Sequence, residues 1–177
     1  MLCRELNSAD LGEYRELHRL SLTHAAGAFA DTVALDAARD DADVAAMLDR
    51  GEAWGAFQDG RLIAKCVMDA MPYPAFAHVR WVHGVYVHPD SRGGGAAMRL
   101  LRAAMIAHRA SGALRFQLWV NAENAPAIGV YKRLGFQEIG RAPQGIRIGE
   151  RYVDDVLMGL GAEEAGAPSL DARPPPT

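Results

Sequence analysis

The sequence predicts an α/β fold in which a mixed β-sheet packs against several helices. Apolar residues recur at helix-like and strand-like spacings in turn, and the resulting order is strand, two helices, three strands, helix, strand, helix, two strands. Half of the 177 residues are hydrophobic and 23% are charged, which is typical of one soluble globular domain with a sizeable core. We assign residues 1–160 to this domain and find no internal repeat.

The first quarter of the chain reads as a strand followed by two helices. After a strand at residues 2–6, apolar side chains recur at helical spacing over residues 7–25, behind the capping candidates Asn7 and Ser8. A glycine- and alanine-rich turn follows. A narrow apolar stripe then predicts a second helix over residues 34–50.

A hairpin and a long strand come next. The strands at 52–58 and 61–70 are separated by the dipeptide Asp-Gly at 59–60, which is typical of a tight β-turn. The prolines of residues 71–76 interrupt regular structure, and a strand is expected over 78–87.

The remaining elements alternate again. Asn124 is a candidate N-cap, and Pro126 lies in the first turn of the helix that follows, where proline is tolerated. The expected elements are a helix at 93–110, a strand at 113–120, a helix at 124–134 and strands at 137–142 and 150–160. Residues 161–177 are rich in alanine, proline and acidic residues with almost no large apolar side chain, so we expect a disordered tail.

Charge and hydropathy disfavour several classes of partner. The formal net charge of −3 and the lack of a polybasic run argue against a nucleic-acid partner. The N-terminus has no apolar signal region, and the apolar runs are too short for a membrane span, so we expect a cytoplasmic protein with no membrane partner. Cys3 and Cys66 fit neither a disulfide framework nor a C-x-x-C metal site, so we expect reduced core thiols and no metal.

The stretch "HPDSRGGGAAMRLL" places three glycines between a strand and a helix. Such a turn presents unpaired backbone N–H groups at the positive end of a helix dipole, which favours a phosphate. A Walker A loop requires Gly-Lys-Ser/Thr, which does not occur in the chain. A dinucleotide fingerprint starting at Gly93 requires glycine where Met98 stands, and the next strand ends in Val120-Asn121 without an acidic residue.

Two motifs resemble those of the GNAT superfamily of N-acetyltransferases. "VHPDSRGGGAAMRLL" resembles the acetyl-CoA-binding pattern V-x-P-x-x-R-G-x-G-x-[GA]-x-x-L of that family, in which Gly94 takes a variable place. "NAENAPAIGVYKRLGF" resembles the pattern N-x-x-A-x-x-x-Y-x-x-x-G-F, one strand further on. The matching residues are Val87, Pro89, Arg92, Gly93, Gly95, Ala97 and Leu100 in the first motif, and Asn124, Ala127, Tyr131, Gly135 and Phe136 in the second.

The resemblance implies the fold and the cofactor site. It implies a mixed, mostly antiparallel sheet of about seven strands, with helices on both faces and a splayed strand pair at the cofactor, where Gly84 would assist a bulge. The cosubstrate implied is acetyl-CoA. Its pyrophosphate would lie on the turn formed by Arg92, Gly93, Gly94, Gly95, Ala96, Ala97 and Met98, and its pantetheine arm along Val85, Tyr86 and Val87. Asn124 would bond the pantetheine, cap its helix, or do both.

The implied reaction is direct transfer of the acetyl group to a primary amine of a small molecule or of a protein N-terminus. A backbone N–H near Val87 would stabilise the oxyanion, and Tyr131 would protonate the leaving sulfur unless it is only a core tyrosine. Many members carry a glutamate on the strand before the glycine turn, whereas this chain has "HVRWVHGVYV". His83 is therefore our candidate base, with His78, Glu123 and ordered water as alternatives. His18, His24, His88 and His108 are expected at the surface.

The acceptor pocket implied by the resemblance is lined by residues 25–36, 71–76 and the connection 141–150. Its candidate apolar walls are Phe29, Tyr73, Phe76 and Trp81, and its candidate ammonium partners are Asp31 and Glu150. The partners expected are acetyl-CoA and an amine acceptor, with a homodimer left open. A catalytically degenerate protein that binds acyl-CoA as a sensor or structural subunit is the alternative function, because the strand glutamate is missing.

Overall fold

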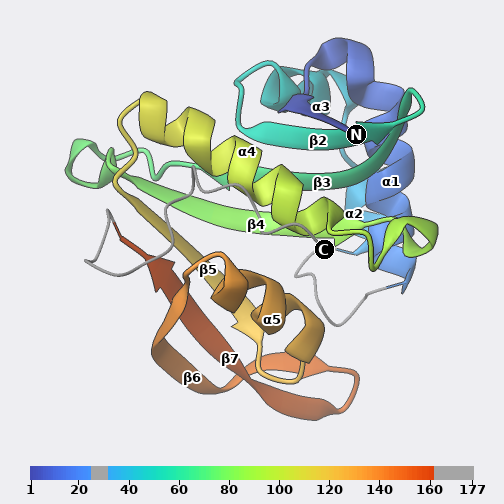
Figure 1. Ribbon diagram of the computed structural model, residues 1–177. Coiled ribbons are helices and arrows are strands. Elements are labelled where there is room, and N and C mark those ends of the chain that lie inside the picture. The colour runs from blue at the N-terminus through green and yellow to red at the C-terminus, as the bar shows by residue number, and fades with distance from the viewer. Residues whose placement is uncertain (25–31, 162–177) are drawn as a thin grey trace.

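The computed structural model describes residues 1–24 and 32–161, which form one seven-stranded sheet with helices (Figure 1). The strands follow the order β1-β2-β3-β4-β5-β7-β6, and β4 and β5 are parallel while the other neighbouring pairs are antiparallel. The strands are β1 (Leu2–Glu5), β2 (Ala53–Gln58), β3 (Arg61–Asp69), β4 (Val79–Val87), β5 (Arg115–Asn121), β6 (Gln137–Ile148) and β7 (Arg151–Leu160). The helices are α1 (Leu11–His24), α2 (Val33–Ala37), α3 (Asp41–Leu48), α4 (Ala96–Ala110) and α5 (Ala125–Arg133).

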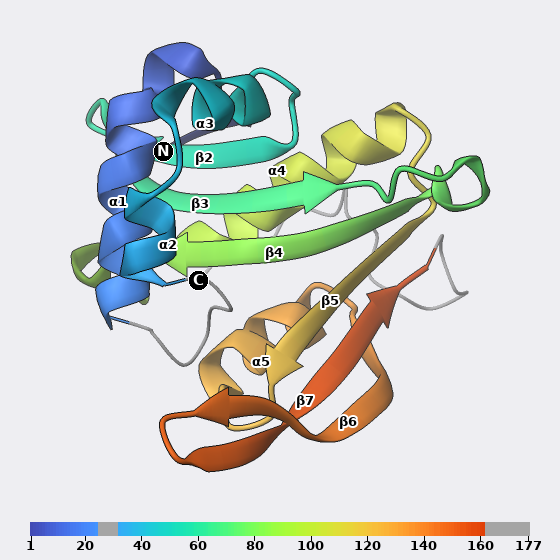
Figure 2. The ribbon, with the colours of Figure 1, turned by 180° about the vertical axis from the view of Figure 1, so that it is seen from behind.

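The sheet carries helices on both faces, as the sequence predicts. Helices α4 and α5 cover the face seen in Figure 1, and α1 and α2 cover the opposite face in Figure 2. Leu100, Leu101 and Met105 of α4 are at most 1% exposed and belong to a core shared with β5 and α5. Tyr14 and Leu17 of α1 belong to a second cluster on the other face. Among the described residues, no helix is long and apolar enough to cross a membrane.

Three expectations about elements need correction. The helix expected over residues 34–50 is two helices, α2 and α3, because the Asp40 side chain accepts from the Ala42 N–H and starts a new helix. Helix α4 begins at Ala96 rather than at residue 93, since the positive φ angles in the glycine turn are incompatible with a right-handed helix. Most of the expected connection 141–150 is strand, because β6 continues to Ile148 opposite β7.

Two histidines expected at the surface are buried. His18 is 7% exposed, and its Nε2 lies 3.7 Å from an oxygen of Asp36, itself 2% exposed. His108 is 9% exposed and stacks at a tilt against Trp54. His18 and His108 lie on the faces of α1 and α4 that pack against the sheet. Their burial therefore depends on how each helix is oriented about its own axis.

Strands β4 and β5 separate after a short parallel contact. Their pairing runs from Val79 with Arg115 to Trp81 with Gln117, although β4 continues to Val87, and Figure 2 shows the two ribbons diverging. The register between β3 and β4 also shifts between Lys65 and Val67, so β4 carries one extra residue. Gly84 has a φ of +61° at this bulge. The predicted splayed strand pair and the predicted bulge are thus confirmed.

Candidate active site

The glycine turn at residues 93–95 needs glycine because of its backbone conformation and not because neighbouring atoms leave no room for a side chain. Gly93 and Gly95 have φ angles of +81° and +77°, which L-residues with a side chain rarely adopt, whereas Gly94 is not in this region. A Cβ atom on any of the three would meet no atom within 4 Å. Gly93 and Gly95 are therefore required for the path of the chain, and Gly94 is not.

The turn leaves a row of backbone donors uncommitted. Gly95 is the N-cap of α4 and supplies no side chain to the first N–H groups of the helix. The first hydrogen bond of the helix runs from the Arg99 N–H to the Gly95 carbonyl at 3.1 Å. Within the described ranges, no hydrogen bond from the N–H groups of residues 93–98 is found, whereas the Arg92 N–H already donates to Pro89. The N-terminus of this 15-residue helix is therefore suited to an anion.

Arg92 folds back along the end of β4. Its Nε donates to the Val87 carbonyl at 3.1 Å, and its guanidinium carbon lies 5.5 Å from the ring centre of Tyr86. Burial raises the pKa of Tyr86, and the nearby Arg92 cation opposes part of that rise. Arg92 thus borders both the glycine turn and the segment Val85 to Val87.

The extra residue of the bulge inverts the alternation of side chains along β4. Val82 packs in the core beneath α4, and Val85 and Val87 pack against that same core three and five residues later. Tyr86 belongs to the cluster beneath α1. Strand alternation from Val82 places His83 on the α1 face as well. The part of the β4 backbone that does not pair with β5 therefore has the α4 core on one face and the α1 cluster on the other.

Tyr131 projects from α5 into the core close to β3. It is 7% exposed, and its ring lies 5.9 Å from that of Phe136. Burial raises the pKa of its hydroxyl well above the ordinary value, and nearby Cys66 adds to that rise. Cys66 stands on β3 opposite the bulge of β4, and Tyr131 belongs to the same core cluster as Cys66. Its hydroxyl remains protonated throughout the physiological range.

His83 has an acidic partner that the sequence did not reveal. Its Nε2 lies 3.0 Å from Oδ2 of Asp69, and both side chains are partly exposed, at 54% and 39%. Asp69 is the last residue of β3, and it pairs with Trp81 in the β3–β4 ladder. Asp69 could have been predicted as a neighbour of His83 only if the register between β3 and β4 were known. The proline-containing connection between these strands is too irregular for the sequence to predict that register.

The other candidate bases lie in different surroundings. Glu123 forms an exposed ion pair with Arg151, with a separation of 3.2 Å. His78 is exposed just before β4, and its carbonyl accepts from Leu114. Asn124 caps α5, because its side chain accepts from the Ala127 N–H at 3.2 Å. The predicted cap is thus confirmed, and the pantetheine contact stays a prediction.

The predicted acceptor walls are only partly described. Tyr73 and Phe76 are exposed, at 57% and 45%, and Trp81 is half-buried on β4. Glu150 is exposed in the turn between β6 and β7. Phe29 and Asp31 lie outside the described residues.

Neither cysteine has the environment of a nucleophile. Cys66 is fully buried, and burial raises the pKa of its thiol to about 12, so it stays protonated. Cys3 is half-buried, and burial raises its pKa as well. In residues 1–24 and 32–161, no group of three or more His, Cys, Asp or Glu side chains is arranged to hold a metal.

The fold and the glycine turn together define a class of protein. Residues 14–136 match the model of the Acetyltransferase (GNAT) family, and the chain belongs to this family. An L-methionine sulfoximine/L-methionine sulfone acetyltransferase from Pseudomonas paraeruginosa is 38% identical over 82 residues, which are 46% of this chain and 47% of that protein. The chain spans about half the length of this curated relative.

Solved structures share the fold. The ribosomal-protein-alanine N-acetyltransferase from Brucella melitensis superposes with a TM-score of 0.78 at 21% identity, covering 91% of this chain and 99% of that chain. YncA of Salmonella typhimurium, solved with its cofactor acetyl-CoA, superposes with a TM-score of 0.80 at 22% identity, covering 95% and 97%. The predicted family and fold are confirmed.

Proposed function

We propose that this protein is an acetyl-CoA-dependent N-acetyltransferase that moves the acetyl group directly to a primary amine. One observation carries the proposal: a row of uncommitted N–H groups at the start of α4 follows, after one short turn, a strand that has separated from its parallel neighbour. Acetyl-CoA combines an anionic pyrophosphate with an extended pantetheine arm that contains amide groups. The free N–H groups suit the pyrophosphate, and the free strand edge suits the arm.

The cosubstrate would contact backbone more than side chains. The N–H groups of residues 93–98 would receive the pyrophosphate, and the free edge of β4 at residues 85–87 would pair with the pantetheine arm. Arg92 lies between these two parts and would add a cation near the phosphates, which requires its terminal nitrogens to turn from Tyr86.

Three groups of this chain would support the chemistry. A backbone N–H near Val87 would stabilise the oxyanion, and the Tyr131 hydroxyl would donate its proton to the departing sulfur. His83 would accept the proton of the incoming amine through Nδ1 while Asp69 holds Nε2. Burial keeps Tyr131 protonated until then.

The acceptor class is the primary amine of a small molecule or of a protein N-terminus. The relative named as acting on methionine sulfoximine and methionine sulfone supports an amino-acid-like acceptor, while the fold neighbour named for ribosomal-protein alanine supports an N-terminal one. Both acceptor types present an amine close to a carbonyl or carboxylate carbon.

The test is release of free thiol from acetyl-CoA in the presence of defined amines. We expect release above the hydrolytic blank with methionine sulfoximine, methionine sulfone or an alanine-terminated peptide, and a product heavier by one acetyl group. If coenzyme A binds but no amine of a broad panel raises thiol release, the proposal fails and the degenerate acyl-CoA-binding function is supported.

A further inference from the structure

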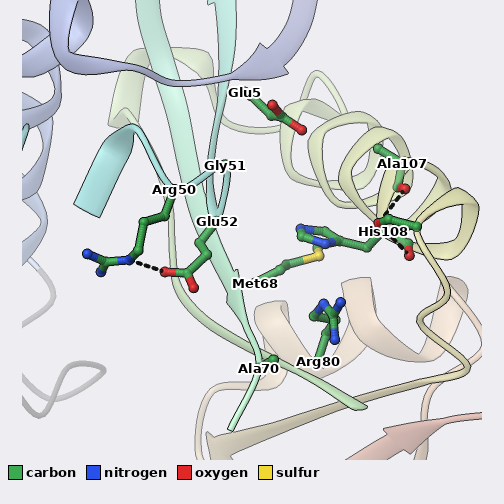
Figure 3. Close-up of a pocket in the computed structure, with 10 residues that line it drawn as sticks. Glu5, Arg50, Gly51, Glu52, Met68, Ala70, Arg80, Ala107 and His108 are labelled. Atoms are coloured by element: carbon green, nitrogen blue, oxygen red, sulfur yellow. Dashed lines mark hydrogen bonds and ion pairs between the residues drawn. The ribbon is translucent and has the colours of Figure 1, made fainter. Parts of the chain in front are cut away.

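Lys65 is a buried cation that has no role in the reaction described above. Among the lysines and arginines that the structure describes, only Lys65 is buried, with an exposed fraction of 1%. Charged side chains elsewhere reach solvent: at the pocket beside the last turns of α4, Glu52 pairs with Arg50 at 3.2 Å and both remain at least partly exposed (Figure 3). Removing an ammonium group from water is costly, so the polar contact of Lys65 inside the protein indicates what this side chain does.

The Lys65 ammonium lies against the bulge of β4. Its Nζ donates to the Gly84 carbonyl at 3.1 Å and lies 5.5 Å from the ring centre of Tyr14 on α1. A Cβ atom on Gly84 would lie 3.7 Å from Nζ and 3.8 Å from the side chain of Val67, which belongs to the cluster beneath α1. Lys65 therefore holds the Gly84 carbonyl from the α1 side of the sheet.

The Gly84 carbonyl shares one peptide unit with the Val85 N–H. In a trans peptide these two groups lie in one plane and point in opposite directions, so the Val85 N–H is directed away from Nζ. Neither Gly84 nor Val85 has a partner in the ladder between β3 and β4, and the pairing of β4 with β5 ends at Trp81. The orientation of this peptide is therefore set by the Lys65 hydrogen bond and not by a regular ladder.

We propose that Lys65 is a positioning residue for acetyl transfer, which holds the Gly84–Val85 peptide so that the Val85 N–H faces the thioester carbonyl of acetyl-CoA. The inference rests on the proposed function and identifies the backbone donor near Val87 as that of Val85. The hydrogen bond from an ammonium group also polarises the peptide, which strengthens its N–H as a donor.

The Val85 N–H would act on the charge that develops during transfer. When the amine attacks the thioester carbon, the π electrons of the carbonyl move to its oxygen, where the N–H stabilises them. These electrons re-form the carbonyl as the C–S bond breaks. The sulfur takes the Tyr131 proton, and the amine loses a proton to His83.

The test observes the thioester carbonyl directly and needs no acceptor amine. The full chain is saturated with acetyl-CoA, and the infrared difference between the complexes with an isotopically labelled and an unlabelled acetyl carbonyl isolates that one band. We expect the band to lie at lower wavenumber than that of a simple thioacetate in hexane, where no hydrogen-bond donor is present.

Lys65→Met keeps the approximate length of the side chain and removes the donor. We expect its carbonyl band at higher wavenumber than in the wild type, and coenzyme A affinity in calorimetry within about twofold of the wild type. With a responsive amine, kcat should fall by about tenfold or more at little change in KM. Lys65→Gln retains a donor on a shorter side chain and should give an intermediate band position.

Leu17→Val is the control for a merely structural effect. It reduces a side chain of the same α1 cluster that is 3% exposed, so it should lower thermal stability. The carbonyl band and kcat should stay as in the wild type, because the Lys65 contact with Gly84 is kept.

The role of Lys65 would be refuted by a wild-type band at the position of the thioacetate in hexane, by an unchanged band in Lys65→Met, or by an equal band change in Leu17→Val. If Lys65→Met does not fold, the wild-type band and Lys65→Gln decide the question. Absence of acetyl-CoA binding would instead refute the proposed function itself.

Discussion

Replacing Gly95 by alanine should expose the conformational role of the glycine turn. Gly95 has a φ of +77°, and a left-handed conformation costs an L-residue about 1–2 kcal/mol. A Cβ atom there would meet nothing within 4 Å, so no steric clash adds to this cost. Gly94 has the same open surroundings without the positive φ, which makes Gly94→Ala the matched control.

The cost must appear in one of two measurements. If the turn keeps its shape, the free energy of unfolding falls by about 1–2 kcal/mol in urea denaturation. If the turn relaxes, the N–H groups of residues 93–98 lose alignment and coenzyme A affinity in calorimetry falls about 5- to 30-fold, the equivalent of the same free energy. Gly94→Ala should change neither quantity appreciably. Equal losses in the two variants, or no loss in Gly95→Ala, would refute this account of the turn.

Three further substitutions test the site and the fold. Tyr131→Phe should reduce turnover by about 10²-fold or more while leaving acetyl-CoA affinity nearly intact, and a loss confined to affinity would contradict its role as the acid. Asp69→Asn should lower kcat and leave acetyl-CoA affinity nearly intact, because His83 would lose the carboxylate that orients its ring; an unchanged kcat would assign the base to water or another group. Hydrogen bonds from Arg4 at 2.7 Å to each Asp10 oxygen hold the pKa of Asp10 below its usual range. That stabilisation is complete above about pH 4–5 and is lost as the pH falls through the lowered pKa, so Asp10→Asn should flatten the acid limb of a urea-stability profile; parallel profiles would contradict it.

Local sequence determined most of the fold because its signals are short-range. The Asp-Gly dipeptide at 59–60 predicted the hairpin, and both residues have positive φ. Asn124 and Pro126 correctly indicated the start of α5. The resemblance to the acetyl-CoA-binding motif, in which Gly94 takes a variable place, distinguished Gly94 from its neighbours, and the φ angles now explain the distinction.

The features that escaped prediction depend on contacts between distant segments. The break between α2 and α3 follows a cap at Asp40 that competes with continuous helix propensity. Burial of His18 and His108 depends on how α1 and α4 rotate against the sheet, which a single histidine does not signal. Asp69 reaches His83 only through the shifted register of β3 and β4.

The bulge on β4, opposite β3, positions the residues that we assign to the proposed reaction. Lys65, which is 1% exposed, donates from Nζ to the Gly84 carbonyl at 3.1 Å, so an oxygen displaced from the regular ladder still has a partner. The positive φ at Gly84 inserts the extra residue, which sets Val85 and Val87 against the α4 core and Tyr86 against the α1 cluster. His83, before the bulge, also faces the α1 side by strand alternation. Acetyl-CoA along the free edge of β4 and an amine acceptor on the α1 face would therefore meet at residues 83–87. The bulge is the local feature that produces this geometry.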